Sequence, residues 1–282
     1  MNESITVRKM QFEFSDEMEL VFIEHDPELS FLFLGTWMLL PYLEPYLMRT
    51  MRKALAEHKD KIGDSRLAYE MQQFCSQEGQ HYQQHAKANE IILSIIPDPS
   101  RQKMVTLLEK VEAEYKSFSA EEPLAWNLAY AEGFEAYTAA GARTQMELRV
   151  FDYMTNPIRD LMLWHIMEEL EHRTVAFDAY EALGRGYVYR LRNGIWAQKH
   201  FVGLGRELTA IMLEAFPKLV AAHQDAESRH IRAQRRKVYY KRTMKNLIGI
   251  YMPWYSPRKL NMPSMYEEAR AEYDSRALST AS

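Results

Sequence analysis

Long stretches of mixed hydrophobic and polar positions run between widely spaced glycines and prolines, which number only 11 each among 282 residues. None of these stretches alternates hydrophobic and polar residues one by one, as a half-buried strand would. Scarce Gly and Pro also disfavour an all-β protein, which needs frequent tight turns. The pattern therefore predicts long helices and an all-α fold.

Local breaks and capping signals divide the chain into helices. Gly63-Asp64-Ser65 interrupts the pattern and supplies a cap, Ser119-Ala120-Glu121-Glu122 has the spacing of a capping box, and Asn156-Pro157 caps a later helix. The predicted helices are about 31–59, 65–95, 99–116, 119–146 and 157–184. Helices of this length are typical of a helix bundle. We therefore expect a bundle in residues 1–185 and a helical extension packed on it in residues 186–282.

The most apolar stretch, residues 31–48, is interrupted by Pro41, Glu44 and Pro45. It falls short of the ~20 uninterrupted apolar residues that a membrane span needs, so we interpret it as a buried helix. Because proline cannot donate to the helix ladder, this helix should be kinked or unwound near Glu44. The kink either is a packing feature or opens a substrate channel. The residues expected to line such a channel are Trp37, Met38, Tyr42 and Tyr46.

Composition narrows the function classes. The net charge is −4, too near balance for a protein that binds nucleic acid through bulk charge. Residues 1–14 lack the basic region and apolar run of a secretory signal. The single cysteine, Cys75, excludes an intramolecular disulfide framework and a zinc site of several thiolates. Both features favour a cytoplasmic protein, and an inert buried thiol is the expected state of Cys75.

Two Glu-x-x-His motifs carry the first sign of chemistry: Glu78 with His81, and Glu169 with His172. Residues three apart lie about 60° apart on a helix, so both side chains of each pair reach one ion. A single pair of this kind is common by chance. The four-helix bundles that hold two metal ions use two such pairs together with one Glu from each of the other two helices.

The other two helices offer those carboxylates. Glu44 lies among apolar and aromatic neighbours, where burial of a lone carboxylate is costly unless a cation or a proton neutralises it. Glu132 and Glu135 lie in an apolar, small-residue run of the next helix, and both remain candidates at this point. The order along the chain is then Glu, Glu-x-x-His, Glu, Glu-x-x-His, one contribution from each helix.

His165 adds a seventh ligand. It precedes Glu169 by four residues and His172 by seven, so the three side chains form one narrow stripe over two helical turns. By the same geometry Glu168 and Glu171 lie far round the helix and face solvent or a neighbour, which favours Glu169 as the ligand. His85 follows His81 by one turn and also approaches the site, most simply as a packed or supporting residue.

These residues resemble those of a bacterial family described as a predicted metal-dependent hydrolase. The resemblance is carried by WHIMEELEH at 164–172, VAFDAY at 175–180, Gly186-Tyr187, the motif of Glu78 and His81, and FEAYTA at 134–139. It covers about residues 10–250 and favours Glu135 over Glu132. The family description implies hydrolysis at a metal centre.

The ligand order and spacing also resemble those of the di-iron arylamine N-oxygenases, which have a ferritin-like fold. On that resemblance, the expected fold is a ferritin-like four-helix bundle with additional C-terminal helices. The proline residues beside Glu44 depart from the pattern. The metal ligands that this resemblance implies are Glu44, Glu78, His81, Glu135, His165, Glu169 and His172.

Mixed carboxylate and imidazole ligands suit iron or manganese. We therefore expect two iron ions, or a mixed manganese–iron pair, with O2 as co-substrate and a small molecule oxygenated or oxidised in the bundle. An oxygenase would also require an electron donor. The alternative is a metal-dependent hydrolase in which the same dinuclear site activates water. A homodimer is one open possibility for the oligomeric state.

A basic segment near the C-terminus divides the net charge. Residues 226–245 carry eight basic side chains and one acid, a sum of +7, which leaves −11 on the other 262 residues. An apolar run at 247–255 follows. The segment 226–255 either contacts an anionic membrane surface or an acidic partner, or is a solvated helix face that pairs with the acidic bundle.

Overall fold

The computed structural model describes residues 5–63 and 65–280, and its regular structure is helical. Within these ranges there is no strand, only an isolated bridge between Ile23 and Met154. The prediction of an all-α helix bundle is confirmed. Asp64 of the predicted cap lies outside the described residues. The helices are α1 (Pro27–Trp37), α2 (Leu40–Glu57), α3 (Lys59–Ile62), α4 (Arg66–Ile95), α5 (Ser100–Glu121), α6 (Leu124–Glu147), α7 (Ile158–His172), α8 (Val175–Leu183), α9 (Tyr187–Ala215), α10 (Pro217–Ala222), α11 (Ala226–Ile250) and α12 (Ser264–Thr280), with short 3-10 turns at Val150–Tyr153 and Pro257–Lys259.

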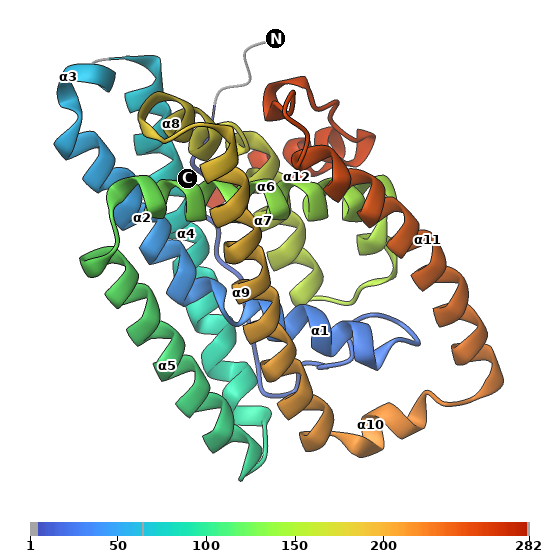
Figure 1. The fold of residues 1–282 in the computed structure, drawn as a ribbon. Coiled ribbons are helices and arrows are strands. Elements are labelled where there is room, and N and C mark those ends of the chain that lie inside the picture. Colours follow the sequence, from blue (N-terminus) through green and yellow to red (C-terminus); the bar gives the residue numbers. More distant parts are fainter. Residues whose placement is uncertain (1–4, 64, 281–282) are drawn as a thin grey trace.

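The bundle is built around α2, α4, α6 and α7. Helix α2 packs against α4, α5 and α6, and α7 packs against α4 and α6 (Figure 1). Helix α9 contacts α1, α5 and α6, so the first helix after residue 185 is part of the central packing. The division into a unit at 1–185 and an extension at 186–282 stays a prediction. Helix α11 contacts α6 and runs along one edge of the molecule.

Helices α6 and α9 approach closely because two glycines meet at their crossing. A Cβ added to Gly133 would lie 2.2 Å from the Cα of Gly194. No side chain fits in that space. The contact therefore sets how closely α9 packs against α6, the helix that carries Glu135.

The prediction of one continuous helix over residues 31–59 is wrong. Helix α1 ends at Trp37, α2 begins at Leu40, and the short α3 follows after His58. Pro41 lies at the start of α2, where its missing N–H costs nothing, and this favours a new helix over a continuous one. Pro45 lies inside α2 and cannot donate to the carbonyl of Pro41. The expected break near Glu44 is thus present, one turn earlier in the chain.

Two other predicted boundaries differ from the structure. Helix α5 continues to Glu121 through the supposed capping box, because the hydroxyl of Ser119 donates to the carbonyl of Tyr115 in its own helix. The predicted helix at 157–184 is divided into α7 and α8 at residues 173–174. There the guanidinium of Arg173 donates to the carbonyl of Leu170, which satisfies an acceptor at the end of α7.

The basic segment forms α11, and part of it pairs with the rest of the bundle. Arg236 forms an ion pair with Asp26, and an Nη atom of Arg242 lies 3.2 Å from Glu147. Arg235 stacks on the ring of Tyr153 with its guanidinium carbon 3.9 Å from the ring centre. Among the described residues, no helix is both long enough and apolar enough to span a membrane.

Candidate metal centre

Four helices bring seven carboxylate and imidazole side chains into the interior of the bundle. Helix α2 supplies one Glu, α4 a Glu and a His, α6 one Glu, and α7 one Glu and two His. Each residue is at most 4% exposed to solvent. The seven residues are Glu44, Glu78, His81, Glu135, His165, Glu169 and His172.

Helix α7 lies at the centre of this cluster. The Nε2 atom of His172 lies 3.3 Å from a carboxylate oxygen of Glu78, 3.4 Å from one of Glu135 and 3.4 Å from one of Glu169. The carboxylates of three helices therefore converge on one imidazole nitrogen. The predicted stripe on α7 is present, since Nε2 of His165 lies 3.1 Å from the same Glu169 oxygen.

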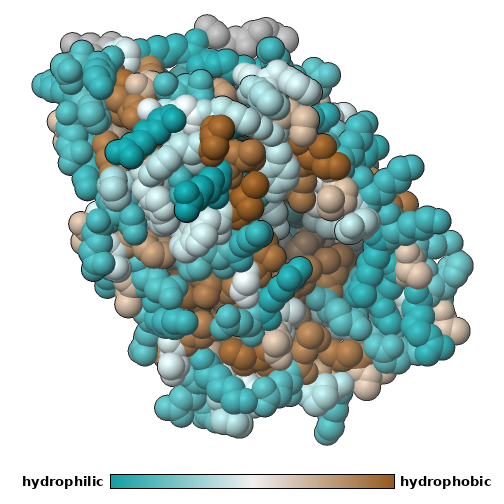
Figure 2. Space-filling view, in the orientation of Figure 1, coloured by the Kyte–Doolittle hydropathy of each residue, from teal (hydrophilic) through white to brown (hydrophobic). Residues whose placement is uncertain are grey.

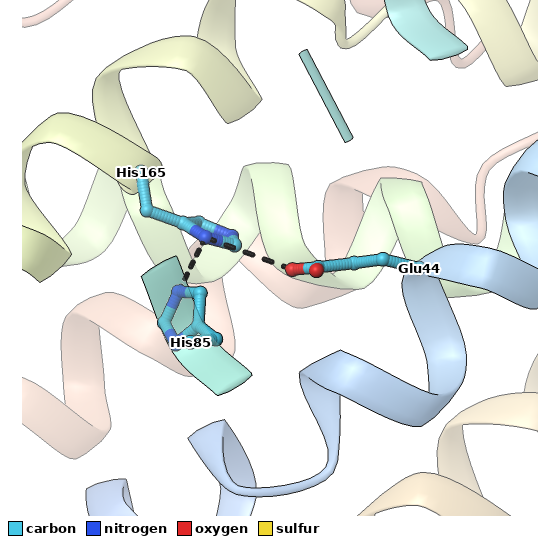
Figure 3. Close-up of side chains that lie close together, drawn as sticks. All are labelled: Glu44, His85 and His165. Carbon is cyan, nitrogen blue, oxygen red and sulfur yellow. Dashed lines mark hydrogen bonds and ion pairs between the residues drawn. The ribbon is translucent and has the colours of Figure 1, made fainter. Parts of the chain in front are cut away.

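The second end of the cluster contains Glu44, His85 and His165, which point toward one another (Figure 3). The Nδ1 atom of His165 lies 2.8 Å from Nε2 of His85 and 3.9 Å from a carboxylate oxygen of Glu44. His85 thus contacts a candidate ligand directly and belongs to one group able to hold an ion. That His85 is a packed or supporting residue stays a prediction.

Several overlapping groups of three side chains have ligand atoms within 4.8 Å of one another, the spacing that a bound ion needs. One end is formed by Glu78, Glu169 and His172, and the other by Glu44, His85 and His165. Two further groups connect these ends through His81. The donors therefore extend over more than one potential ion position.

The donor atoms at the centre lack hydrogen-bond partners, although they are buried. Charged or polar atoms are costly to bury in this state, because they lose water without gaining a partner. A divalent cation would provide the missing interactions, so the residues present fit a metal ion. The unpartnered atoms are both carboxylate oxygens of Glu44 and of Glu135, Oε1 of Glu78, Oε2 of Glu169, Nδ1 of His81 and Nε2 of His172.

The proton affinities of these groups reflect crowded negative charge. Burial, with repulsion from Glu78, raises the pKa of Glu44 well above its usual range. Burial, with repulsion from Glu169, raises the pKa of Glu135 to about 8. Burial alone would lower the pKa of His172, but Glu169 and Glu135 raise it well above its ordinary value. Without a cation, protons must neutralise the cluster; a divalent ion would replace them.

Supporting side chains fix the orientation of two imidazoles. The Nε2 atom of His81 lies 3.0 Å from a carboxylate oxygen of Glu168, and Nδ1 of His172 lies 2.9 Å from the amide oxygen of Gln77. In each ring the other nitrogen is left facing the cluster. Partners of this kind hold metal-binding histidines in the productive tautomer.

A buried arginine connects these two partners. Arg8 donates from Nη1 to Glu168 at 3.0 Å and from Nη2 to Glu171 at 2.8 Å. The amide of Gln77 donates to Glu171 at 2.9 Å, so Arg8 stabilises both supports. Glu168 and Glu171, expected to face solvent or a neighbour, face this neighbour and are at most 5% exposed. Sequence reasoning missed Arg8 because no helical spacing connects it to the motifs.

The two candidate glutamates of α6, Glu132 and Glu135, differ in their partners. Glu132 forms an ion pair with Arg190 at 2.7 Å and so has a partner of its own. Glu135 has no hydrogen-bond partner and faces His172. Burial still raises the pKa of Glu132 to about 7 despite the opposing effect of Arg190.

The residues expected to line a substrate channel are mainly core residues. Met38 and Tyr46 are 1% and 0% exposed, and the hydroxyl of Tyr46 donates to Asn127 at 2.7 Å. Trp37 and Tyr42 are partly buried and pack against the same core.

Cys75 is buried, and burial raises the pKa of its thiol to about 11, which agrees with an inert thiol. Two surface cavities of about 350 and 640 Å³ are lined by none of the seven candidate ligands.

Comparison with known proteins identifies the family of the chain. No curated protein and no solved structure matches it. A family model described as a predicted metal-dependent hydrolase matches residues 6–261, which include every residue of the buried cluster. The chain therefore belongs to this family of predicted metal-dependent hydrolases.

Proposed function

We propose that the chain is a hydrolase that uses two divalent metal ions held between α2, α4, α6 and α7. The observation that carries this proposal is the convergence of buried, unpartnered carboxylate oxygens and imidazole nitrogens from all four helices. Four carboxylates balance the charge of two divalent ions. The proposed ligands are the seven residues of the cluster, with Glu135 rather than Glu132 on α6.

The metal would supply Lewis acidity and lower the pKa of water to near neutrality. The protein residues provide the rest. Glu168 and Gln77 orient His81 and His172, each through one ring nitrogen. The enclosing core excludes bulk water, which strengthens every electrostatic interaction inside the site. Glu44, whose two oxygens have no hydrogen-bond partner, would hold the metal from α2.

A second candidate function is activation of O2 by two iron ions, with oxidation of a small molecule and an external electron donor. It is favoured by one specific observation: each of two helices contributes a Glu, and each of two others a Glu-x-x-His pair, the donor set of di-iron and di-manganese bundles. His165 would be an additional nitrogen donor. The family description favours hydrolysis, so we rank the redox reaction second.

The two functions differ in what they require. Protein should be stripped of metal, reloaded separately with zinc, manganese or iron, and assayed against ester, amide and phosphoester panels with and without oxygen. A hydrolase will turn over anaerobically and with redox-inert zinc. An oxygenase will require iron, a reductant and O2 and will consume O2 stoichiometrically with product.

The metal itself is tested by a double substitution. Glu169→Ala with His172→Ala removes donors from the centre of the cluster and should abolish binding of at least one ion per chain, measured by elemental analysis. Glu181→Ala, on the exposed surface of α8, is the control and should retain the metal content of the unmodified protein. Equal metal content in both variants would overturn both functions.

A further inference from the structure

The outward face of α11 carries two kinds of side chain that are seldom left exposed together. Lys237, Lys241 and Lys245 recur every four residues and therefore lie along one face of the helix. Met244 and Ile248 lie on the same face, and Ile248 is 52% exposed. Figure 1 shows α11 along one edge of the molecule, and this edge is predominantly hydrophilic in Figure 2. The exposed apolar residues are thus embedded in a basic surface.

The positive charge of this face is largely uncompensated. Within the described part of the chain, no carboxylate forms an ion pair with Lys237, Lys241 or Lys245. The arginines on the inner side of α11 are different, because Arg236 and Arg242 pair with Asp26 and Glu147. The inner cations therefore hold α11 on the bundle, whereas the outer lysines are available for another anion.

A basic hollow continues this face beyond the end of the helix. It has a volume of about 270 Å³ and is lined by the cationic residues Arg143, Lys245 and Lys259, with no Asp or Glu in its wall. Arg143 pairs with Glu147, and the same carboxylate also pairs with Arg242. One negative charge is therefore shared by two arginines, and a net positive charge remains beside the hollow. Trp254 also lines the hollow and is 74% exposed.

We propose that the outer face of α11 and this hollow dock the protein on an anionic lipid bilayer. Lysines with exposed Met244 and Ile248 at helical spacing are typical of a helix that lies in the membrane interface, and the exposed Trp254 follows in the turn after α11. Tryptophan prefers the headgroup level, and a phosphate-bearing headgroup complements the hollow in charge. An acidic protein would account for the lysines but not for the exposed Ile248 and Trp254. This docking does not depend on the metal centre.

The test is co-sedimentation of the full-length, metal-loaded protein with vesicles. Phosphatidylcholine vesicles containing phosphatidylserine should bind the protein, and vesicles of phosphatidylcholine alone should not. Added salt should release it, because screening weakens exposed charges. Each lysine near such a surface contributes about fivefold in affinity, so Lys237→Gln with Lys241→Gln and Lys245→Gln should lower binding about a hundredfold. Trp254→Ala should lower it several-fold.

Matched controls separate docking from a general charge effect. Lys59→Gln with Lys61→Gln and Lys87→Gln removes the same charge from exposed positions on α3 and α4, and Tyr69→Ala removes another exposed aromatic ring. Both should bind vesicles as the unmodified protein does. Equal loss in the control triple variant, or equal binding to both vesicle types, would overturn the proposal. So would capture by soluble polyglutamate without vesicle binding, which would indicate an acidic protein partner, or full release by glycerophosphoserine, which would indicate a site for soluble phosphate esters.

Discussion

A carboxylate oxygen of Glu168 lies 3.0 Å from Nε2 of His81, and neither side chain is exposed to solvent. Burial opposes protonation of His81, but the carboxylates of Glu168 and Glu78 raise its pKa to about 10. In the neutral ring that a metal ion would bind, the contact with Glu168 keeps the remaining proton on Nε2 and leaves Nδ1 toward the cluster. Glu168 is a positioning residue for His81.

Glu168→Gln should weaken metal binding without removing a ligand. The amide oxygen of Gln is a weaker acceptor for His81, and its NH2 group can donate to Nε2 and so favour the tautomer with the proton on Nδ1. Loss of such a partner typically costs about 10–100-fold in metal affinity. Competition with a metal chelator measures the change. Glu181→Gln, at an exposed position of α8, should leave the affinity unchanged. An unaltered affinity in Glu168→Gln would show that Glu168 acts only in packing.

Arg8→Ala should destabilise the whole fold. Arg8 is 1% exposed and pairs with Glu168 and Glu171, so its removal takes the nearest guanidinium away from two buried carboxylates. Breaking a buried ion pair from one side costs about 3–5 kcal/mol. The free energy of unfolding should fall by this amount in urea titrations of the metal-free protein. Arg8→Lys should rescue only part of it, because an ammonium cannot reproduce the donor fork of the guanidinium.

The control for Arg8 is Arg229→Ala. Arg229 lies on the exposed side of α11, where a charged side chain contributes at most a few tenths of a kcal/mol, within the ~0.5 kcal/mol typical of surface substitutions. A loss at Arg229 as large as that at Arg8 would contradict the role assigned to the buried pair.

Glu135→Gln and Glu132→Gln should separate two kinds of buried glutamate on one helix. Glu135 has no protein partner for its oxygens, so its neutralisation should reduce the metal bound per chain, as measured by elemental analysis. Glu132 is paired with Arg190, so its neutralisation should leave the metal content unchanged and lower the free energy of unfolding by about 3 kcal/mol. The reverse pattern would place Glu132 in the metal site.

The sequence predicts the metal-binding motifs and most of the helices that carry them. It does not predict the residues that orient and neutralise the candidate ligands. Helical spacing alone predicts that His165, Glu169 and His172 share a face, because α7 is regular over that span. The position of Arg8 depends on how a segment without helical structure crosses the bundle, which local patterns do not encode. The choice between Glu132 and Glu135 likewise depends on Arg190, a residue of α9 whose approach requires the Gly133–Gly194 contact.

That contact gives a prediction of its own. Gly133→Ala would place a Cβ 2.2 Å from the Cα of Gly194, so α6 and α9 must separate, at a cost of at least about 1–3 kcal/mol typical of overpacking. Thermal unfolding measures the loss. Gly141→Ala on the same helix meets nothing within 4 Å and should instead stabilise by about 0.5–1 kcal/mol, because alanine is the better helix former. Equal effects at both positions would contradict the tight crossing.

The metal-free protein should lose stability as pH rises from about 7 to 10, above the range in which His85 and His165, whose lowered pKa values act in the opposite sense, titrate. Glu135 has a pKa of about 8 in the folded chain against an ordinary value of 4.5, and His81 about 10 against 6.5. In both cases the folded state binds more protons than the unfolded state between the two values, so raising the pH through that window favours unfolding. Bound metal replaces these protons, which should flatten the pH dependence and make metal affinity increase with pH. Thermal unfolding of metal-free and metal-loaded protein across this range tests both points, with proton release measured calorimetrically in two buffers. Metal-free protein that gains stability up to pH 9 would show that the cluster is not held together by protons.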